Sequence, residues 1–184
     1  MQRQDFPKMF DEMGFKVGAE IGVYEGKFSA HILANSSLSL LHSIDSWCNV
    51  EGVSLQSILD TCKTVLAPFG SRSNIIVSSS HEASKQFEDE SLDFVYIDAD
   101  HRYDAVVDDI LVWFPKVRKG GILSGHDYTI SSAGKGIGAF QTTPNQPCRG
   151  KKGVKKAVDE FVDKHGIKLH LTDKGCKSWW IIKE

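Results

Sequence analysis

Short apolar runs alternate along the chain with segments in which apolar residues recur at helical spacing, and this alternation limits the fold more than any other feature. The helical spacing is clearest from Tyr103 to Phe114, where apolar residues fall on one helix face. Repeated strand–helix units favour an α/β, Rossmann-like sandwich with a mostly parallel sheet. The runs predicted as its strands are Val17–Val23, Leu40–Ile44, Asn74–Val77, Leu92–Ile97 and Ile122–Ser124.

The rest of the chain completes this pattern. Two closing strands, Ile167–Leu171 and Trp179–Ile182, flank a turn at Asp173–Gly175, which predicts an antiparallel hairpin. A further turn is predicted at Lys119–Gly121, just before the fifth strand. The predicted helices cover Phe6–Met13, Phe28–Leu33, Leu55–Leu66 with Ser54 as its cap, a short segment from Ser80, Tyr103–Phe114 and Val154–Val162.

Length and composition predict one soluble domain, residues 1–184, because the chain is 41% hydrophobic and 25% charged. No apolar run of about 18 residues or apolar leader is present, so no membrane association or export is expected. The four cysteines form no Cys-x-x-Cys pair, which favours free thiols and a cytoplasmic location. A net charge of −2 argues against nucleic-acid binding through bulk electrostatics.

Residues 129–153 interrupt the alternation, since Gly, Ser, Thr, Pro, Asn and Gln dominate there. Loops longer than about 12–15 residues are uncommon in compact domains and are usually lids, binding loops or disordered segments. This segment follows the fifth predicted strand at its carboxyl end, where ligands bind in such sheets. We therefore expect a lid over the substrate.

The first predicted strand ends in a loop that contains Gly22 and Gly26, which allow sharp turns and close approach of a ligand. The loop departs from the dinucleotide fingerprint, because Tyr24 and Lys27 stand where that pattern has glycines. Glu20, inside the strand end, suits a ligand that carries a positive group. An ordinary glycine turn is the alternative.

The next two strand ends carry polar residues that suit a nucleoside. Asp45 lies about 20 residues past the glycine loop, a spacing that places an acid near ribose hydroxyls. Ser79 and Ser80 could contact an adenine edge, although an N-cap is the main role expected for Ser80. A helix cap is likewise the alternative for Asp45.

The fourth and fifth strand ends bring together acids and imidazoles. Neighbouring strands lie about 5 Å apart, so Asp98 and Asp127 could share a divalent cation, Mg²⁺ or Mn²⁺. A nitrogen ligand from His126 would favour Mn²⁺, Fe²⁺ or Zn²⁺ over Mg²⁺. Without a cation, His101 or His126 is the candidate general base. The alternatives are helix caps for the two acids and a structural hydrogen bond for His101.

Taken in order, these residues resemble the class I S-adenosylmethionine-dependent methyltransferases. Glu20, Gly22 and Gly26 match motif I, E/D-x-G-x-x-x-G, and Asp45, Ser78–Glu82, Ile97–His101, Gly120–Gly121 and His126–Tyr128 follow in the family's order. The branch that the chain resembles most is that of small bacterial enzymes related to the metal-dependent O-methyltransferases.

The resemblance implies a seven-stranded sheet in the order 3-2-1-4-5-7-6 with an antiparallel last strand. It implies that Glu20 and Gly22 face the methionyl part of the cofactor, that Asp45 takes the ribose hydroxyls, and that Ser79 and Ser80 flank adenine. Gly26 and Asp98 complete the expected cofactor-binding residues. Asp98 matches the first metal-binding aspartate of the metal-dependent branch. His126 and Asp127 stand where that branch has an Asp-Asn pair.

The expected function is methyl transfer from S-adenosylmethionine to a small-molecule acceptor, at a hydroxyl oxygen, with a divalent cation and with Asp98, His101 and His126 as catalytic candidates. One alternative is an NAD-dependent oxidoreductase, against which Tyr24 and Lys27 argue. Another is a non-catalytic nucleoside-binding or partner-binding domain of the same fold. A homodimer stays open, because Trp179 and Trp180 point to opposite sides of a strand.

Overall fold

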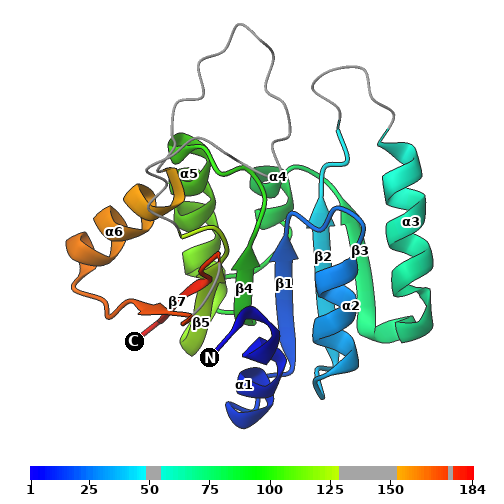
Figure 1. The fold of residues 1–184 in the computed structure, drawn as a ribbon, viewed down its shortest axis with the longest axis horizontal. Helices are drawn as coiled ribbons and strands as arrows, with labels where there is room; N and C mark the ends of the chain where they lie inside the picture. The colour runs from blue at the N-terminus through cyan, green and yellow to red at the C-terminus, as the bar shows by residue number, and fades with distance from the viewer. Residues whose placement is uncertain (49–54, 129–152, 174–175) are drawn as a thin grey trace, which may run out of the picture.

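The computed structural model describes residues 1–48, 55–128, 153–173 and 176–184, which contain a seven-stranded sheet (Figure 1). The strand order is β3-β2-β1-β4-β5-β7-β6, and β7 is antiparallel to both of its neighbours while the other pairs are parallel. The predicted fold class and strand order are confirmed. The strands are β1 (Val17–Ile21), β2 (Leu40–Asp45), β3 (Ser73–Val77), β4 (Leu92–Ile97), β5 (Val117–Gly125), β6 (His170–Leu171) and β7 (Trp179–Ile182).

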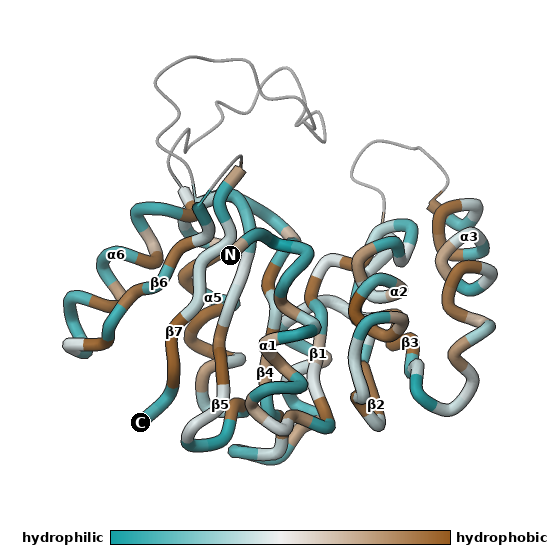
Figure 2. The backbone as a smooth tube through the Cα atoms, turned by 60° about the horizontal axis from the view of Figure 1, so that its bottom comes forward, coloured by the Kyte–Doolittle hydropathy of each residue, from teal (hydrophilic) through white to brown (hydrophobic). Residues whose placement is uncertain are grey.

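Helices cover both faces of the sheet, with α1 and α2 in front of it and α4 and α5 behind it in Figure 1. Their apolar faces pack on the strands, and in Figure 2 hydrophobic colour follows β7 while the turns of α6 alternate between the two colours. The helices are α1 (Phe6–Glu12), α2 (Lys27–Ala34), α3 (Gln56–Leu66), α4 (Ser80–Ser84), α5 (Tyr103–Trp113) and α6 (Gly153–His165), with short 3-10 turns at Arg3–Asp5, Ala67–Arg72 and Phe114–Lys116.

The central strand β4 shows why the sheet has two cores. Its alternate residues point to opposite faces, so Phe94 and Tyr96 enter the core under α1, α2 and α3. Val95 and Ile97 enter the core under α4, α5 and α6. A strand buried on both faces requires a continuous apolar run, which is the pattern that predicted this strand.

Aromatic contacts hold the N-terminal segment against β4. The rings of Phe10 and Phe94 stack with centroids 3.8 Å apart, and the ring of Phe6 meets that of Tyr96 edge-on at 5.4 Å. Phe94 also lies over Gly18 of β1, where an added Cβ would stand 2.1 Å from the ring. This packing places the first residues of the chain beside the carboxyl end of β4.

Two local predictions are corrected by the structure. Lys119–Gly121 is no turn before the fifth strand but lies inside β5, where the register shifts between the pairs Leu92–Val117 and Phe94–Ile122. A left-handed Gly120, with φ of 72°, absorbs this irregularity. The strand predicted at Ile167–Leu171 is paired only over its last two residues.

Some predictions fall outside the described residues. These are the Ser54 cap, nearly all of the loop at 129–153 with its expected role as a lid, and residues 174–175 of the hairpin turn. In the part of the chain that is described, no helix is both long enough and apolar enough to cross a bilayer.

Gly18 offers a test of the packing between β1 and β4. We expect Gly18→Ala to lower the free energy of unfolding by about 1–3 kcal/mol, the usual cost of overpacking a core, because the new methyl group meets the Phe94 ring. Urea unfolding measures the effect. In Gly18→Ala/Phe94→Leu the smaller side chain makes room, so the loss should be less than the sum of the single losses. Additive losses would contradict the contact.

Candidate functional site

The carboxyl ends of β1 and β4 meet at a glycine. Gly22 follows β1 with φ of 88°, and a Cβ there would lie 2.3 Å from the carbonyl oxygen of Asp98. Only glycine combines this conformation with so close an approach. The loop after β1 is therefore pressed against the end of β4, which brings Glu20 and Asp98 into one region.

Asp45, at the end of β2, fixes the shape of the same loop. One carboxylate oxygen accepts hydrogen bonds from the backbone N–H groups of Val23 and Tyr24, both at 2.9 Å, and the other accepts from that of Trp47 at 2.9 Å. A carboxylate has about four acceptor positions, so these three donors leave room for one more. Asp45 therefore fixes two loops and caps none of the described helices, and it stays available for the predicted ribose role.

Glu20 is the buried acid of the site, with 1% of its surface exposed. It accepts a hydrogen bond from the Ser29 hydroxyl, which also lies 2.7 Å from the Ser43 hydroxyl oxygen. Burial raises the pKa of Glu20 to about 8, against an ordinary value of 4.5, although the Ser29 hydrogen bond and Arg3 pull the pKa down. Near neutral pH the free protein therefore holds this carboxyl mostly protonated.

A cavity of about 220 Å³ opens over Glu20 at the end of β1. It joins the predicted cofactor residues Glu20, Gly22 and Asp98 to a cationic group that the sequence patterns did not indicate. The lining residues are Arg3, Glu20, Gly22, Val23, Tyr24, Glu25, Lys27, Phe28 and Asp98.

Arg3 reaches the cavity from the 3-10 turn that precedes α1. Its Nη2 donates to Asp98 Oδ2 at 2.6 Å, and its guanidinium lies 4.0 Å above the Phe28 ring and 5.3 Å from that of Tyr96. Such stacking holds the planar cation in place. No local motif marks Arg3, because only the packing of the following aromatic residues on β4 carries it to the site.

Asp98 also belongs to a second cluster, at the ends of β4 and β5. His101 Nε2 lies 3.4 Å from Asp98 Oδ1 and 3.1 Å from Asp127 Oδ2. His126 Nδ1 lies 3.3 Å from Asp127 Oδ1 and 3.9 Å from Asp98 Oδ1. The structure thus brings together all four residues that were predicted for catalysis or a metal.

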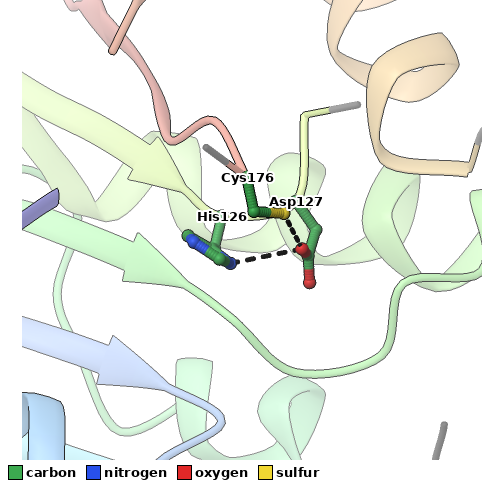
Figure 3. Close-up of side chains that lie close together, drawn as sticks. All are labelled: His126, Asp127 and Cys176. Atoms are coloured by element: carbon green, nitrogen blue, oxygen red, sulfur yellow. Dashed lines mark hydrogen bonds and ion pairs between the residues drawn. The ribbon is translucent and has the colours of Figure 1, made fainter. Parts of the chain in front are cut away.

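Cys176 joins this cluster from the segment before β7, and its thiol donates to Asp127 Oδ1 (Figure 3). The same oxygen faces His126, so Asp127 stands between an imidazole and a thiol. In the sequence, Cys176 is one of four scattered cysteines, and no spacing marks it as part of a site. Its position depends on the hairpin lying against β5, where Tyr128 N–H donates to Lys177 O at 2.9 Å.

The charges in the cluster stabilise one another. The hydrogen bond to Asp98 raises the pKa of His101, while the one from His126 holds the pKa of Asp127 well below its usual range. Burial, together with the neighbouring Asp127 carboxylate, raises the pKa of the Cys176 thiol to about 12. In the absence of a cation the thiol is therefore a hydrogen-bond donor and no nucleophile.

The donor chemistry of the cluster fits a divalent cation, but less well a purely oxygen-ligated one. Two sets of ligand atoms, one from Asp98, His101 and Asp127 and one from His126, Asp127 and Cys176, each lie within 4.8 Å of one another. Carboxylate oxygens suit Mg²⁺ and Mn²⁺, whereas imidazole and thiol sulfur suit the later transition metals.

The remaining predicted cofactor residues lie away from the cavity. Gly26, with φ of 80°, starts α2 and packs near Cys62 Sγ, which a Cβ would approach to 3.1 Å. The cap of α4 is Ser79 and not Ser80, because the Ser79 hydroxyl accepts from Glu82 N–H at 3.3 Å. Ser80 is engaged with α5, donating to Asp109 and accepting from Trp113 Nε1.

Comparison with known proteins agrees with this geometry. Residues 19–128, more than half of the chain, match the family model described as "Methyltransferase domain". A sequence search of curated proteins returned no match. The chain therefore belongs to the methyltransferase-domain family, as the resemblance predicted.

Solved structures show the same fold at low identity. An O-methyltransferase from Bacillus cereus, in complex with SAH, has a TM-score of 0.71 and 14% identity, covering 98% of this chain and 80% of that chain. TomG from Streptomyces achromogenes, an O-methyltransferase of tomaymycin synthesis in complex with SAM, has a TM-score of 0.73 and 13% identity. The match covers 99% of this chain and 79% of that chain. A Staphylococcus aureus protein described as a candidate caffeoyl-CoA O-methyltransferase has a TM-score of 0.74 and 16% identity. The match covers 99% of this chain and 82% of that chain.

The buried carboxyl of Glu20 predicts a pH dependence of stability. Between pH 4.5 and about 8 the folded protein holds a proton on Glu20 that the unfolded chain releases, so Glu20 makes the free energy of unfolding fall as the pH rises. Glu20→Gln keeps a side-chain oxygen that can accept the hydrogen bond from the Ser29 hydroxyl, but its amide does not titrate in this pH range. We expect it to be more stable than the parent at pH 8 by roughly 1–4 kcal/mol, with little difference at pH 4.5.

Urea unfolding from pH 4.5 to pH 8 measures the difference between the two proteins at each pH. Glu88→Gln, at an exposed carboxylate, is the matched control and should follow the parent throughout. A constant difference between Glu20→Gln and the parent would contradict the raised pKa.

Proposed function

We propose that this protein transfers the methyl group of S-adenosylmethionine to a hydroxyl oxygen of a small-molecule acceptor, acting as one catalytic domain. The observation that carries the proposal is the cavity of about 220 Å³, where the buried Glu20 carboxyl and the Arg3 guanidinium line one space that adjoins Asp98. An amino-acid group carries an ammonium and a carboxylate. The Arg3 guanidinium would pair with the carboxylate, and the Glu20 carboxyl would give up its proton and pair with the ammonium when the ligand binds. The O-methyltransferases of the same fold support oxygen as the acceptor atom.

In the proposed complex the cofactor lies along the ends of β1 and β2. Its ammonium group is near Glu20, its carboxylate is near Arg3, and one of its ribose hydroxyls donates to the remaining acceptor position of Asp45. Gly22 lets the loop after β1 close against the Asp98 backbone, and it borders the cavity that would take the methionyl chain. Gly26 shapes the loop that leads into α2. Ser79, which follows β3, would contact the adenine edge.

Methyl transfer from a sulfonium needs little covalent help from a protein. The acceptor oxygen forms a bond to the methyl carbon while the carbon–sulfur bond breaks, and the bonding pair stays on sulfur to give S-adenosylhomocysteine. The protein must align the three atoms and take the hydroxyl proton. His101 is the proposed proton acceptor, because its ring is half-exposed at the cluster while that of His126 is more deeply buried.

A divalent cation, Mg²⁺ or Mn²⁺ in the simplest case, is part of the proposal. Asp98, His126 and Asp127 would hold it, and it would supply electrostatic lowering of the pKa of a nearby hydroxyl. His101 and Asp98 would then position the hydroxyl group of the methyl acceptor.

Calorimetric titration tests the cofactor. We expect S-adenosylhomocysteine to bind with a micromolar Kd and NAD⁺ not to bind. Asp45→Ala should weaken S-adenosylhomocysteine binding by about tenfold, the cost of one lost hydrogen bond to a charged group, and Asp60→Ala, at an exposed acid of α3, should leave it unchanged. Binding of NAD⁺ alone would replace the proposal by an oxidoreductase. Binding of neither would favour a partner-binding domain.

Arg3 allows the amino-acid end of the cofactor to be tested separately. Arg3→Gln should weaken S-adenosylhomocysteine binding by about tenfold, in line with loss of a charge-assisted hydrogen bond. Binding of 5′-methylthioadenosine, which lacks the amino-acid group, should not change. An equal loss for both ligands would mean that Arg3 only supports the fold through Phe28 and Asp98.

A further inference from the structure

We propose that the cluster at the ends of β4 and β5 is a site for a borderline transition-metal ion of the Zn²⁺, Co²⁺ or Fe²⁺ type, with the Cys176 sulfur as one of its ligands. The inference refines the cation of the proposed function and rests on that function only for the role of the ion. Binding of the ion is tested on its own.

The distances match those between ligands of one metal ion. Zinc–nitrogen and zinc–oxygen bonds of about 2.0–2.2 Å and zinc–sulfur bonds of about 2.3 Å place neighbouring tetrahedral ligand atoms roughly 3–4 Å apart. His126 Nδ1 is 3.3 Å from Asp127 Oδ1, and the Cys176 thiol donates a hydrogen bond to the same oxygen. One ligand atom from each of these three residues lies within 4.8 Å of the other two. A metal ion at this place would replace the thiol proton of Cys176, and the sulfur would move away from Asp127 Oδ1 to the spacing expected for two ligands of one ion.

Asp98 and His101 border these three side chains and form, with Asp127, the second group of ligand atoms. Asp98 Oδ1 lies 3.9 Å from His126 Nδ1, within the same range, and His101 Nε2 lies 3.4 Å from that carboxylate oxygen. His101 is then placed to hydrogen-bond the ligating carboxylates, as outer-shell partners of metal ligands commonly do. The donor set around Cys176 is one sulfur, one nitrogen and one oxygen, with the Asp98 carboxylate beside it.

The chemistry of these donors selects the metal. A site of two carboxylates alone would suit a hard cation such as Mg²⁺. Imidazole and thiolate instead prefer Zn²⁺ and its neighbours. Cys176 is therefore the residue that decides between the two classes of metal.

The fold fixes the approach of Cys176. Its neighbour Lys177 accepts a backbone hydrogen bond from Tyr128, and Ser178 N–H donates to Thr172 Oγ1 at 3.0 Å. These contacts tie the segment before β7 to the end of β5, next to His126 and Asp127. The other described cysteines stand elsewhere, Cys62 within α3 and Cys48 after β2.

Cobalt binding provides a direct readout of a sulfur ligand. The full-length protein, stripped of metal with a chelator and kept reduced with a phosphine, is titrated with Co²⁺ under anaerobic conditions. We expect a thiolate-to-cobalt charge-transfer absorption in the near ultraviolet that Zn²⁺ abolishes by competition. Cys48→Ser, the matched control at an exposed thiol, should show the same absorption.

Substitution of the ligand separates the outcomes. Cys176→Ser and Cys176→Ala should lose the charge-transfer absorption, and their affinity for Zn²⁺ should fall by about tenfold or more, since even loss of an outer-shell partner costs that much. Circular dichroism establishes that both variants are folded. Absence of the absorption in the parent, or its persistence in folded Cys176→Ser, overturns the inference.

Titration of the same samples with S-adenosylhomocysteine keeps the two proposals distinguishable. Charge transfer without cofactor binding would support the metal site and contradict the methyltransferase proposal. Binding of S-adenosylhomocysteine without the charge-transfer absorption would support the methyltransferase proposal and contradict the metal site.

Discussion

The Asp98 carboxylate links the two halves of the site, and the arrangement of the rest depends on it. One oxygen accepts from Arg3 at the cavity over Glu20, while the other faces His101 and His126. Asp98 holds this position because it follows the buried strand β4 and because Gly22 closes against its backbone. A ligand bound at β1 and a cation or substrate bound at β5 would therefore both contact, directly or through one neighbour, the same Asp98 carboxylate.

Most of the fold was predictable because burial has a simple signature. Phe94 and Tyr96 on one face of β4, with Val95 on the other, form a run that only a doubly covered strand requires. The turn predicted at Lys119–Gly121 was wrong, because glycines favour a turn and a bulge inside a strand equally well. Ser79 took the cap predicted for Ser80, a shift of one residue that helix-start signals do not resolve.

The site was predictable only where strand ends supply it. Asp98, His101, His126 and Asp127 follow two strands that pair, so the topology alone brings them together. Arg3 and Cys176 lie near opposite ends of the chain and reach the site through tertiary packing, by the aromatic contacts of Phe6 and by the hairpin beside Tyr128. No spacing in the sequence encodes such contacts, although these two residues add the charge and the sulfur that refine the proposed chemistry.

The central claim is that the cavity over Glu20 holds the methionyl end of the methyl donor, next to the Asp98 cluster. A crystal structure of the complex with S-adenosylhomocysteine tests it most directly. The account predicts the amino-acid group between Glu20 and Arg3, the ribose at Asp45, and the sulfur on the side of Asp98. A ligand bound elsewhere, or bound here with its amino-acid group away from Glu20 and Arg3, would contradict it.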